Sequence, residues 1–154
     1  MVFASSTSRV MIIWITHVLI SHIVSDKLVA ESEFSSAVQT EKEALLNTGW
    51  WNDRIPKNNS DHCGWAGITC NKAGSVTNIS FNDKKIIQGQ RELGLFNFSC
   101  FPNLKYLELQ FNNLSGRIPS NIGDISKLNY LYLSYNNLIG SIPQEIGKLR
   151  NLKE

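Results

Sequence analysis

The chain has 154 residues, with 15 Lys and Arg against 13 Asp and Glu, for a formal net charge of +2. This length predicts one domain at most. A charge so close to balance excludes the strongly basic class of nucleic-acid-binding proteins, and it offers no polybasic patch for a membrane surface.

The segment Met1–Ser25 has the layout of a secretory signal peptide. Arg9 supplies one positive charge, and the apolar stretch Val10–Val24 follows it with several polar interruptions. A transmembrane helix needs about 20 apolar residues, so this stretch is too short and too interrupted to span a membrane. A signal anchor or a buried helix is the alternative. We therefore predict export and removal of this segment, with Ser25 or Ala30 as the last residue removed.

A polar lead-in and a short helix are predicted next. Residues 26–39 are rich in Ser and Glu, and we expect them to be flexible. Thr40 and Glu43 form a capping box, which predicts a helix that begins at Thr40 and ends at Gly49. Trp50–Trp51 follows directly. The first coil of a stack has no upstream neighbour, so we expect these two rings to cover its open face.

The chain contains three cysteines, of which Cys63 and Cys70 form a C-x6-C pair. Zinc coordination would require further ligands, and His62 and Cys100 are the nearby candidates. A redox pair is usually C-x-x-C in a cytosolic fold. Predicted export favours an oxidised structural pair instead. Cys100 is then either a small buried thiol or a site of intermolecular pairing.

The segment Val76–Phe81 places its apolar residues in the same frame as the later segment Leu104–Leu109. In this alignment Val76 corresponds to Leu104, and Ile79 corresponds to Leu107. The match predicts a strand and a first, irregular coil of a repeating structure. The return side of that coil is predicted to contain three apolar residues: Leu93, Leu95 and Phe96.

The most informative feature is an internal repeat. When Phe101–Asp124 is placed over Ile125–Lys148, half of the columns are identical. A third copy begins at Leu149 and reaches Leu152. A repeat of this length with the pattern L-x-x-L-x-L-x-x-N is the leucine-rich-repeat signature.

Each repeated residue type has a physical role in such a coil. Leu107 and Leu109 alternate, so both point to one face of a short strand, and they are buried only if successive coils stack. Asn112 and Asn136 are predicted to form a ladder that satisfies turn backbone groups, whereas Lys84 occupies that position in the first coil. The prolines of the return side argue against an amphipathic helix. The pattern predicts an α/β solenoid.

The motif N-N-L-S-G-x-I-P-x-x-I-G, at Asn112–Gly123, closely resembles the plant-type repeat of leucine-rich-repeat receptor-like kinases and receptor-like proteins. The resemblance runs from about Thr40 to the end. It implies a parallel β-sheet on the concave face, a helical N-terminal cap over residues 40–75, and repeats over residues 76–154: one irregular, two regular and one truncated. It also implies a disulfide between the cap cysteines: Cys63 and Cys70.

We find no set of residues with the spacing of a catalytic site. The three histidines are scattered, two of them in the predicted signal peptide: His17, His22 and His62. A P-loop, a kinase Gly-rich loop and a kinase catalytic loop are all missing from the sequence. We therefore expect no enzymatic activity, no cofactor and no metal. In the family that the chain resembles, a Ser/Thr kinase domain lies further downstream.

The outward-facing positions of the predicted strands form a candidate ligand face. Register places aromatic residues and one carboxylate there: Tyr106, Glu108, Phe111, Tyr130, Tyr132 and Tyr135. Aromatic residues with polar groups are common anchors of recognition surfaces, although tyrosine at these positions also resembles the family consensus. The expected partner is a protein or peptide ligand, or a partner receptor ectodomain, and not a nucleic acid or a small-molecule cofactor.

Four N-x-Ser sequons are candidate glycosylation sites in an exported protein: Asn58, Asn78, Asn97 and Asn113. Asn58 and Asn97 lie in predicted loops. A glycan on Asn78 would obstruct the concave face.

Three functions remain open from the sequence. The first is an extracellular recognition module, secreted or at the cell surface if a membrane span lies downstream. The second is a secreted enzyme inhibitor that resembles polygalacturonase-inhibiting proteins. The third is a structural remnant without a role of its own. Because the residues after Leu149 enter a new strand frame, we expect the chain to be a piece of a larger ectodomain.

Overall fold

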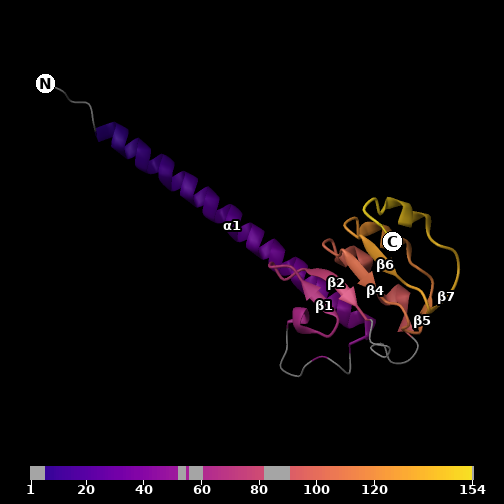
Figure 1. Cartoon of the computed structure of the whole chain (residues 1–154). Coiled ribbons are helices and arrows are strands. Elements are labelled where there is room, and N and C mark those ends of the chain that lie inside the picture. Colours follow the sequence, from indigo (N-terminus) through magenta and orange to yellow (C-terminus); the bar gives the residue numbers. More distant parts are fainter. Residues whose placement is uncertain (1–5, 52–54, 56–60, 82–90, 154) are drawn as a thin grey trace. The chain divides into compact units, whose positions relative to one another are not determined.

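The computed structural model describes residues 6–51, 55, 61–81 and 91–153, except for the side chains of residues 6–15 and 34 (Figure 1). Contacts divide the chain into two compact units, residues 1–36 and residues 37–154. We call them the N-terminal unit and the repeat unit. Lys84, which occupies the ladder position of the first coil, and Asn58 lie outside the described residues.

A single long helix, α1, runs from Ser6 to Thr48. The prediction that a helix begins at Thr40 was therefore wrong, and residues 26–39 are helical instead of loosely ordered. The reason is that Ser6–Thr48 contains no Pro and no Gly, so nothing interrupts the helical backbone upstream of the capping box. The helix does end where predicted, because Gly49 adopts a φ of 66°.

The side chains described in the N-terminal unit are exposed. Among them are Val18, Leu19, Ile20, Ile23, Val24, Leu28 and Val29. None of the helices described meets the length and apolarity that a membrane crossing requires.

The main sheet of the repeat unit has four strands in the order β1-β2-β4-β6 (Figure 1). Their bounds are Ile68–Cys70, Val76–Ser80, Tyr106–Glu108 and Tyr130–Tyr132. Strand β1 is antiparallel to β2, and the other pairs are parallel. Ile79 pairs with Leu107, and Leu107 pairs with Leu131, which confirms the register predicted from the aligned segments.

A smaller parallel sheet and short 3-10 helices form the return side of the coils. The sheet contains β3 (Arg91–Glu92), β5 (Leu114–Gly116) and β7 (Asn137–Leu138). The return-side 3-10 helices are η2 (Leu93–Leu95), η3 (Phe98–Cys100), η4 (Ser120–Asp124) and η5 (Gln144–Lys148), and η1 (His62–Gly64) belongs to the cap. Pro119 and Pro143 immediately precede η4 and η5, where a fixed φ and a missing N–H are tolerated.

The core lies between the two sheets and continues into an aromatic cluster under the cap. Leu107, Leu109 and Leu114 are completely buried. Within the cluster, the ring of Phe96 stacks on Trp50 and Phe101, with centroid distances of 5.4 and 4.6 Å. This cluster provides the cover that the first coil would otherwise lack.

Not every predicted return-side residue is buried. Leu93 and Phe96 are completely buried as expected, whereas Leu95 is 50% exposed. Leu95 is the last residue of the 3-10 helix η2, and its side chain faces the surface because consecutive residues of a single helical turn point in different directions.

A disulfide closes a loop within the cap, and a buried carboxylate joins the cap to the first coil. Cys63 and Cys70 are bonded, as the family resemblance implied, and Cys100 is free and half-buried. The Glu41 carboxylate accepts hydrogen bonds from Ser75 Oγ at 2.6 Å and from Val76 N at 2.8 Å. A side chain of α1 thus accepts hydrogen bonds from the donors at the start of β2, where a preceding coil would otherwise supply the acceptors.

Candidate functional site

The outward-facing side chains of β2, β4 and β6 form the candidate ligand face. Two columns cross these strands. One contains Asn78, Tyr106 and Tyr130, and the other contains Ser80, Glu108 and Tyr132. The structure therefore brings together four of the six residues predicted for this face, in the predicted register.

Glu108 lies at the centre of this face and is 8% exposed. Its Oε2 accepts hydrogen bonds from Ser80 Oγ at 2.5 Å and from the Tyr106 hydroxyl at 3.2 Å, and its Oε1 accepts one from Gln110 Nε2 at 2.9 Å. All three donors are neutral. They hold the carboxylate in a defined position, and none of them supplies a positive charge to compensate it.

Three tyrosine rings lie next to this carboxylate. The Tyr106 ring is 5.8 Å from the ring of Tyr130 and 5.8 Å from the ring of Tyr132, measured between centroids. All three residues are half-buried. The Nζ of Lys153 lies 5.9 Å from the centroid of Tyr130, so this ring already contacts a cation.

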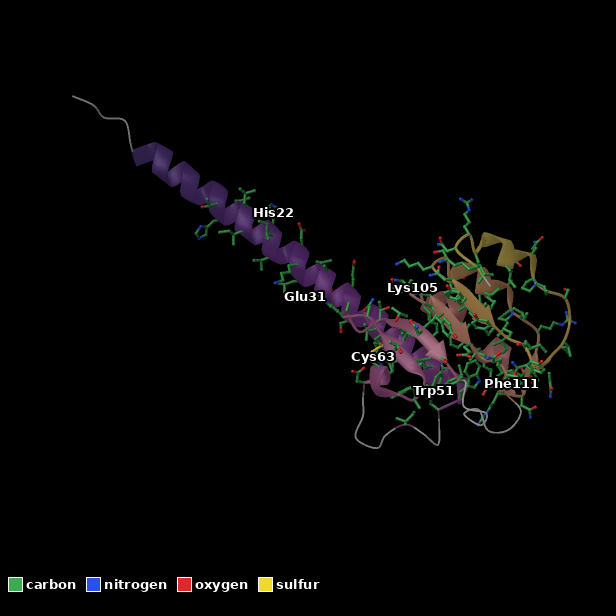
Figure 2. All side chains as sticks on the ribbon, viewed as in Figure 1. His22, Glu31, Trp51, Cys63, Lys105 and Phe111 are labelled. Carbon is green, nitrogen blue, oxygen red and sulfur yellow. A yellow bond between two sulfur atoms is a disulfide. The ribbon has the colours of Figure 1, made fainter. Side chains whose placement is uncertain are left out.

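A second aromatic group lies beyond the carboxyl end of the strands, where Figure 2 labels Phe111. The rings of Phe111 and Tyr135 stack with a centroid distance of 4.2 Å and an interplanar angle of 9°. Phe111 is 46% exposed and Tyr135 is 73% exposed. Their φ values are 60° and 55°, a left-handed conformation that costs a non-glycine residue about 1–2 kcal/mol.

Lys105 marks the other end of the face, immediately before β4, and its side chain is exposed (Figure 2). The face therefore runs from a basic residue, past the buried carboxylate and its tyrosines, to an exposed aromatic stack. None of the residues that the structure describes on this face is paired with a second group in a way that suits covalent chemistry. Exposed aromatic side chains of this kind are common anchors of recognition surfaces.

The ladder asparagines lie behind this face. Asn112 is buried, and its Nδ2 donates to the carbonyls of Phe81 and Gln110 at 3.2 and 2.7 Å. Asn136 Nδ2 donates to Leu109 O at 2.7 Å, and its Oδ1 accepts from the backbone of Asn112 and Leu114. Each of these amides thus reaches back to the coil before its own.

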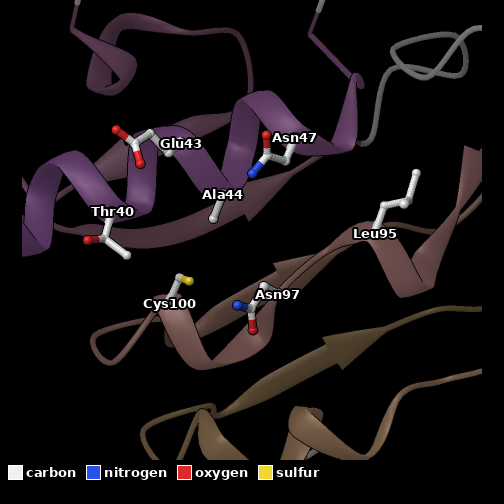
Figure 3. A pocket seen from close by; sticks show the side chains of 7 residues that line it. All are labelled: Thr40, Glu43, Ala44, Asn47, Leu95, Asn97 and Cys100. Carbon is white, nitrogen blue, oxygen red and sulfur yellow. The ribbon is translucent and has the colours of Figure 1, made fainter.

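A separate pocket of about 160 Å³ lies between the last turns of α1 and the helices η2 and η3 (Figure 3). Its lining includes Glu43, Asn47, Leu95, Asn97 and Cys100. Burial raises the pKa of the Cys100 thiol, and the nearby charge of Glu41 raises it further. The thiol therefore stays protonated at neutral pH and is a poor nucleophile.

The three described sequons differ in their surroundings. Asn97 and Asn113 are exposed, and each uses its Oδ1 as an acceptor, from Asn121 at 3.0 Å and from Asn137 at 3.4 Å. A glycan is attached through the amide nitrogen, so these contacts leave the attachment atom unused. Asn78 is half-buried between β1 and β4, where a glycan would stand on the candidate ligand face.

One group of potential metal ligands occurs among the described residues. The ligand atoms of His62, Cys63 and Cys70 lie within 4.8 Å of one another. Because the two sulfurs are bonded to each other, neither is a thiolate that could hold zinc.

The sequence did not identify the partners of Glu108. Ser80 shares its predicted column, so this contact could have been inferred from register. The contacts of Gln110 and Tyr106 with Glu108 could not be inferred, because whether a side chain reaches two residues along its own strand depends on rotamers.

The comparisons with known proteins agree with this geometry. Residues 96–154 match the family model described as leucine rich repeat. The chain is 41% identical over 71 residues to Receptor-like protein 35 of Arabidopsis thaliana, a match that covers 44% of this chain and 7% of that protein. It is 38% identical over 68 residues to the leucine-rich repeat receptor-like serine/threonine-protein kinase RGI4 of the same plant, with 44% and 6% covered.

A solved structure shows the same arrangement. The leucine-rich-repeat ectodomain of the receptor kinase GASSHO1/SCHENGEN3 from Arabidopsis thaliana, in complex with CASPARIAN STRIP INTEGRITY FACTOR 2, superposes with a TM-score of 0.54. It is 30% identical, and the match covers 75% of this chain and 14% of that one. The chain thus spans less than a tenth of the length of the two receptor-like relatives described above.

Proposed function

Because the chain is a leucine-rich-repeat protein of the kind found in plant receptor-like proteins and receptor kinases, we propose that it is an extracellular recognition module. Its concave face binds a peptide or a partner receptor ectodomain. The chain itself is not an enzyme, and any kinase activity belongs to a domain outside it.

The exposed stack of Phe111 and Tyr135 is the observation that carries this proposal. Two large rings are held on the surface in a left-handed backbone conformation, which is unfavourable for residues of this size. Stacking of the rings contributes about 0.5–1.5 kcal/mol and offsets part of that cost. A stacked pair of exposed aromatic rings is the type of anchor that recognition surfaces use.

The similar structures support the same function. The superposed ectodomain was crystallised with a factor bound to it, and the relatives that share the repeat are receptor-like proteins. Export fits the predicted signal peptide and a disulfide-bonded cap, since disulfides persist in oxidising compartments. In the plant, the protein is secreted, or lies at the cell surface if its full-length product contains a membrane span.

Panning of a displayed random peptide library against the full chain tests this function. Enriched peptides should lose at least tenfold in affinity when Phe111 and Tyr135 are both replaced by serine. Arg150→Ser, which changes an exposed residue outside the face, is the matched control and should leave affinity unchanged.

Equal binding by the serine double variant would show that the concave face is not the recognition surface. Inhibition of a secreted polygalacturonase by the full chain would instead favour the inhibitor alternative.

A further inference from the structure

The Glu108 carboxylate lacks a counter-charge among the described residues. The ion pair found in the described part of the chain joins His62 and Glu41, and no basic side chain there pairs with Glu108. Its three hydrogen-bond donors are a serine hydroxyl, a tyrosine hydroxyl and a glutamine amide. A carboxylate that belongs to a residue only 8% exposed and that is surrounded by neutral donors is an unusual arrangement, because burying an uncompensated charge is costly.

Neutral donors position this carboxylate without saturating it. An ionised carboxylate offers about four acceptor sites. Ser80, Tyr106 and Gln110 occupy three of them, so the described part of the chain leaves one for a further donor. A cationic donor would fill that position and neutralise the charge in the same contact, which gives a charge-assisted hydrogen bond.

The neighbouring tyrosine rings are suited to the same ligand group. Tyr132 pairs with Glu108 across β4 and β6, and the Tyr106 ring on β4 lies 5.8 Å from the rings of both Tyr130 and Tyr132 on β6. Aromatic ring faces attract cations within about 6 Å. Lys153 already approaches Tyr130 in this way, which shows that the electron-rich face of this ring is accessible to an ammonium group.

We propose that Glu108, Tyr106, Tyr130 and Tyr132 form a subsite for a basic side chain, lysine or arginine, of a peptide ligand. The proposal rests on the function proposed above and names the chemistry of one ligand position. The carboxylate contributes the charge, and the rings contribute stacking surface. The neutral partners Ser80 and Gln110 are positioning residues that hold the carboxylate toward the ligand.

A purely structural role for Glu108 is the competing explanation. In that case the carboxylate only links neighbouring strands, and the face has no preference for the charge of a ligand. The two explanations therefore differ in charge selectivity, which stability measurements alone would not detect.

The test uses the full chain with isotope-labelled tyrosine rings, observed by NMR. N-acetyl-arginine amide, N-acetyl-lysine amide and N-acetyl-citrulline amide are the probes, because citrulline has the shape of arginine without its charge. We expect saturable shifts of the Tyr106, Tyr130 and Tyr132 signals with at least one cationic probe, and at least tenfold weaker binding of citrulline. The arginine and lysine titrations decide which cation is preferred.

Two variants make this result specific. Glu108→Gln preserves the shape of the side chain and removes its charge. In this variant arginine and citrulline should bind with nearly equal affinity. Glu43→Gln removes the same charge from an exposed position on α1 and should leave the preference unchanged. If Glu108→Gln fails to fold, Tyr132→Leu is used instead, and we expect it to weaken binding of both cations at least threefold.

Equal binding of citrulline and arginine by the unmodified chain would overturn the subsite. A charge preference that survives Glu108→Gln in a folded variant would overturn it too. If library peptides bind through Phe111 and Tyr135 while the charge preference is missing, the subsite fails and the recognition function stands. If the charge preference is present but no library peptide binds through this face, the recognition function fails and the cation site stands without a peptide role.

Discussion

Two consecutive coils of this solenoid have closely similar sequences and very different burial. We call Phe101–Asp124 the upstream coil and Ile125–Lys148 the downstream coil. The upstream leucines Leu107, Leu109 and Leu114 are completely buried, whereas the downstream equivalents are half-buried: Leu131, Leu133 and Leu138. Ile142 is 74% exposed. Identical residues thus contribute differently because burial in a stack is determined by the neighbouring coils.

Hydrogen bonding follows a different rule from burial. Asn136 belongs to the half-buried downstream coil, yet its amide satisfies backbone groups of the buried upstream coil, at Leu109, Asn112 and Leu114. The loss of a downstream side chain can therefore damage the coil before it. These two rules lead to three predictions for the free energy of unfolding, measured by urea melts of the full chain.

The largest difference between the coils should come from their equivalent strand leucines. Leu107→Ala removes a fully buried side chain and should cost about 2–5 kcal/mol, through lost transfer free energy and the cavity that remains. Leu131→Ala removes a half-buried side chain and should cost about 1 kcal/mol. Losses of equal size would show that the two coils are equally buried in solution, which would contradict the comparison.

Within the half-buried downstream coil, the ladder asparagine should contribute much more to stability than its neighbour. Asn136→Ala removes hydrogen bonds to N–H and carbonyl groups of the upstream coil and to Leu133 O of the downstream coil, and it should cost about 1–3 kcal/mol. Asn137→Ala is the control, because Asn137 is exposed and its contact with Asn113 is long, at 3.4 Å; its cost should stay within about 0.5 kcal/mol. If the two variants were equally stable, the ladder role of Asn136 would be refuted.

Alanine substitution of the equivalent glycines should change the free energy of unfolding in different directions in the two coils, and the change at the downstream glycine should be the smallest of those predicted. A Cβ added at Gly123 would lie 2.7 Å from Glu145 O, so Gly123→Ala forces the next coil away and should destabilise by about 1–3 kcal/mol. The equivalent Gly147 has no atom within 4 Å of an added Cβ, and Gly147→Ala should be neutral or stabilise by up to about 1 kcal/mol. A destabilised Gly147→Ala variant would indicate that another molecule or coil packs there in solution.

The sequence alone was enough to predict the repeat itself. Alternating leucines and the alignment of successive copies determine which strands pair and in what register, since a one-residue shift would turn the leucines outward. The end of α1 at Gly49 was also predictable, because a glycine with positive φ terminates a helix by local conformation. The cysteine pairing came from the resemblance to a family and is present in the structure.

Other features depended on contacts between distant residues. The start of α1 was predicted wrongly because a capping box is a local signal, and the upstream residues can continue the helix without a break. Strand β1 was not predicted, because a strand as short as Ile68–Cys70 becomes stable only when a partner such as β2 is available.

The candidate site also combines features that the sequence determines with features that depend on tertiary packing. Repeat alignment and register determined which side chains share the concave face, because strand geometry sends alternate residues to the same side. Only the tertiary structure decided that Glu108 is buried against neutral donors, that Phe111 stacks on Tyr135, and that the two coils differ in burial. These features arise from side-chain packing across strands, and one repeat read by itself contains no information about its neighbours.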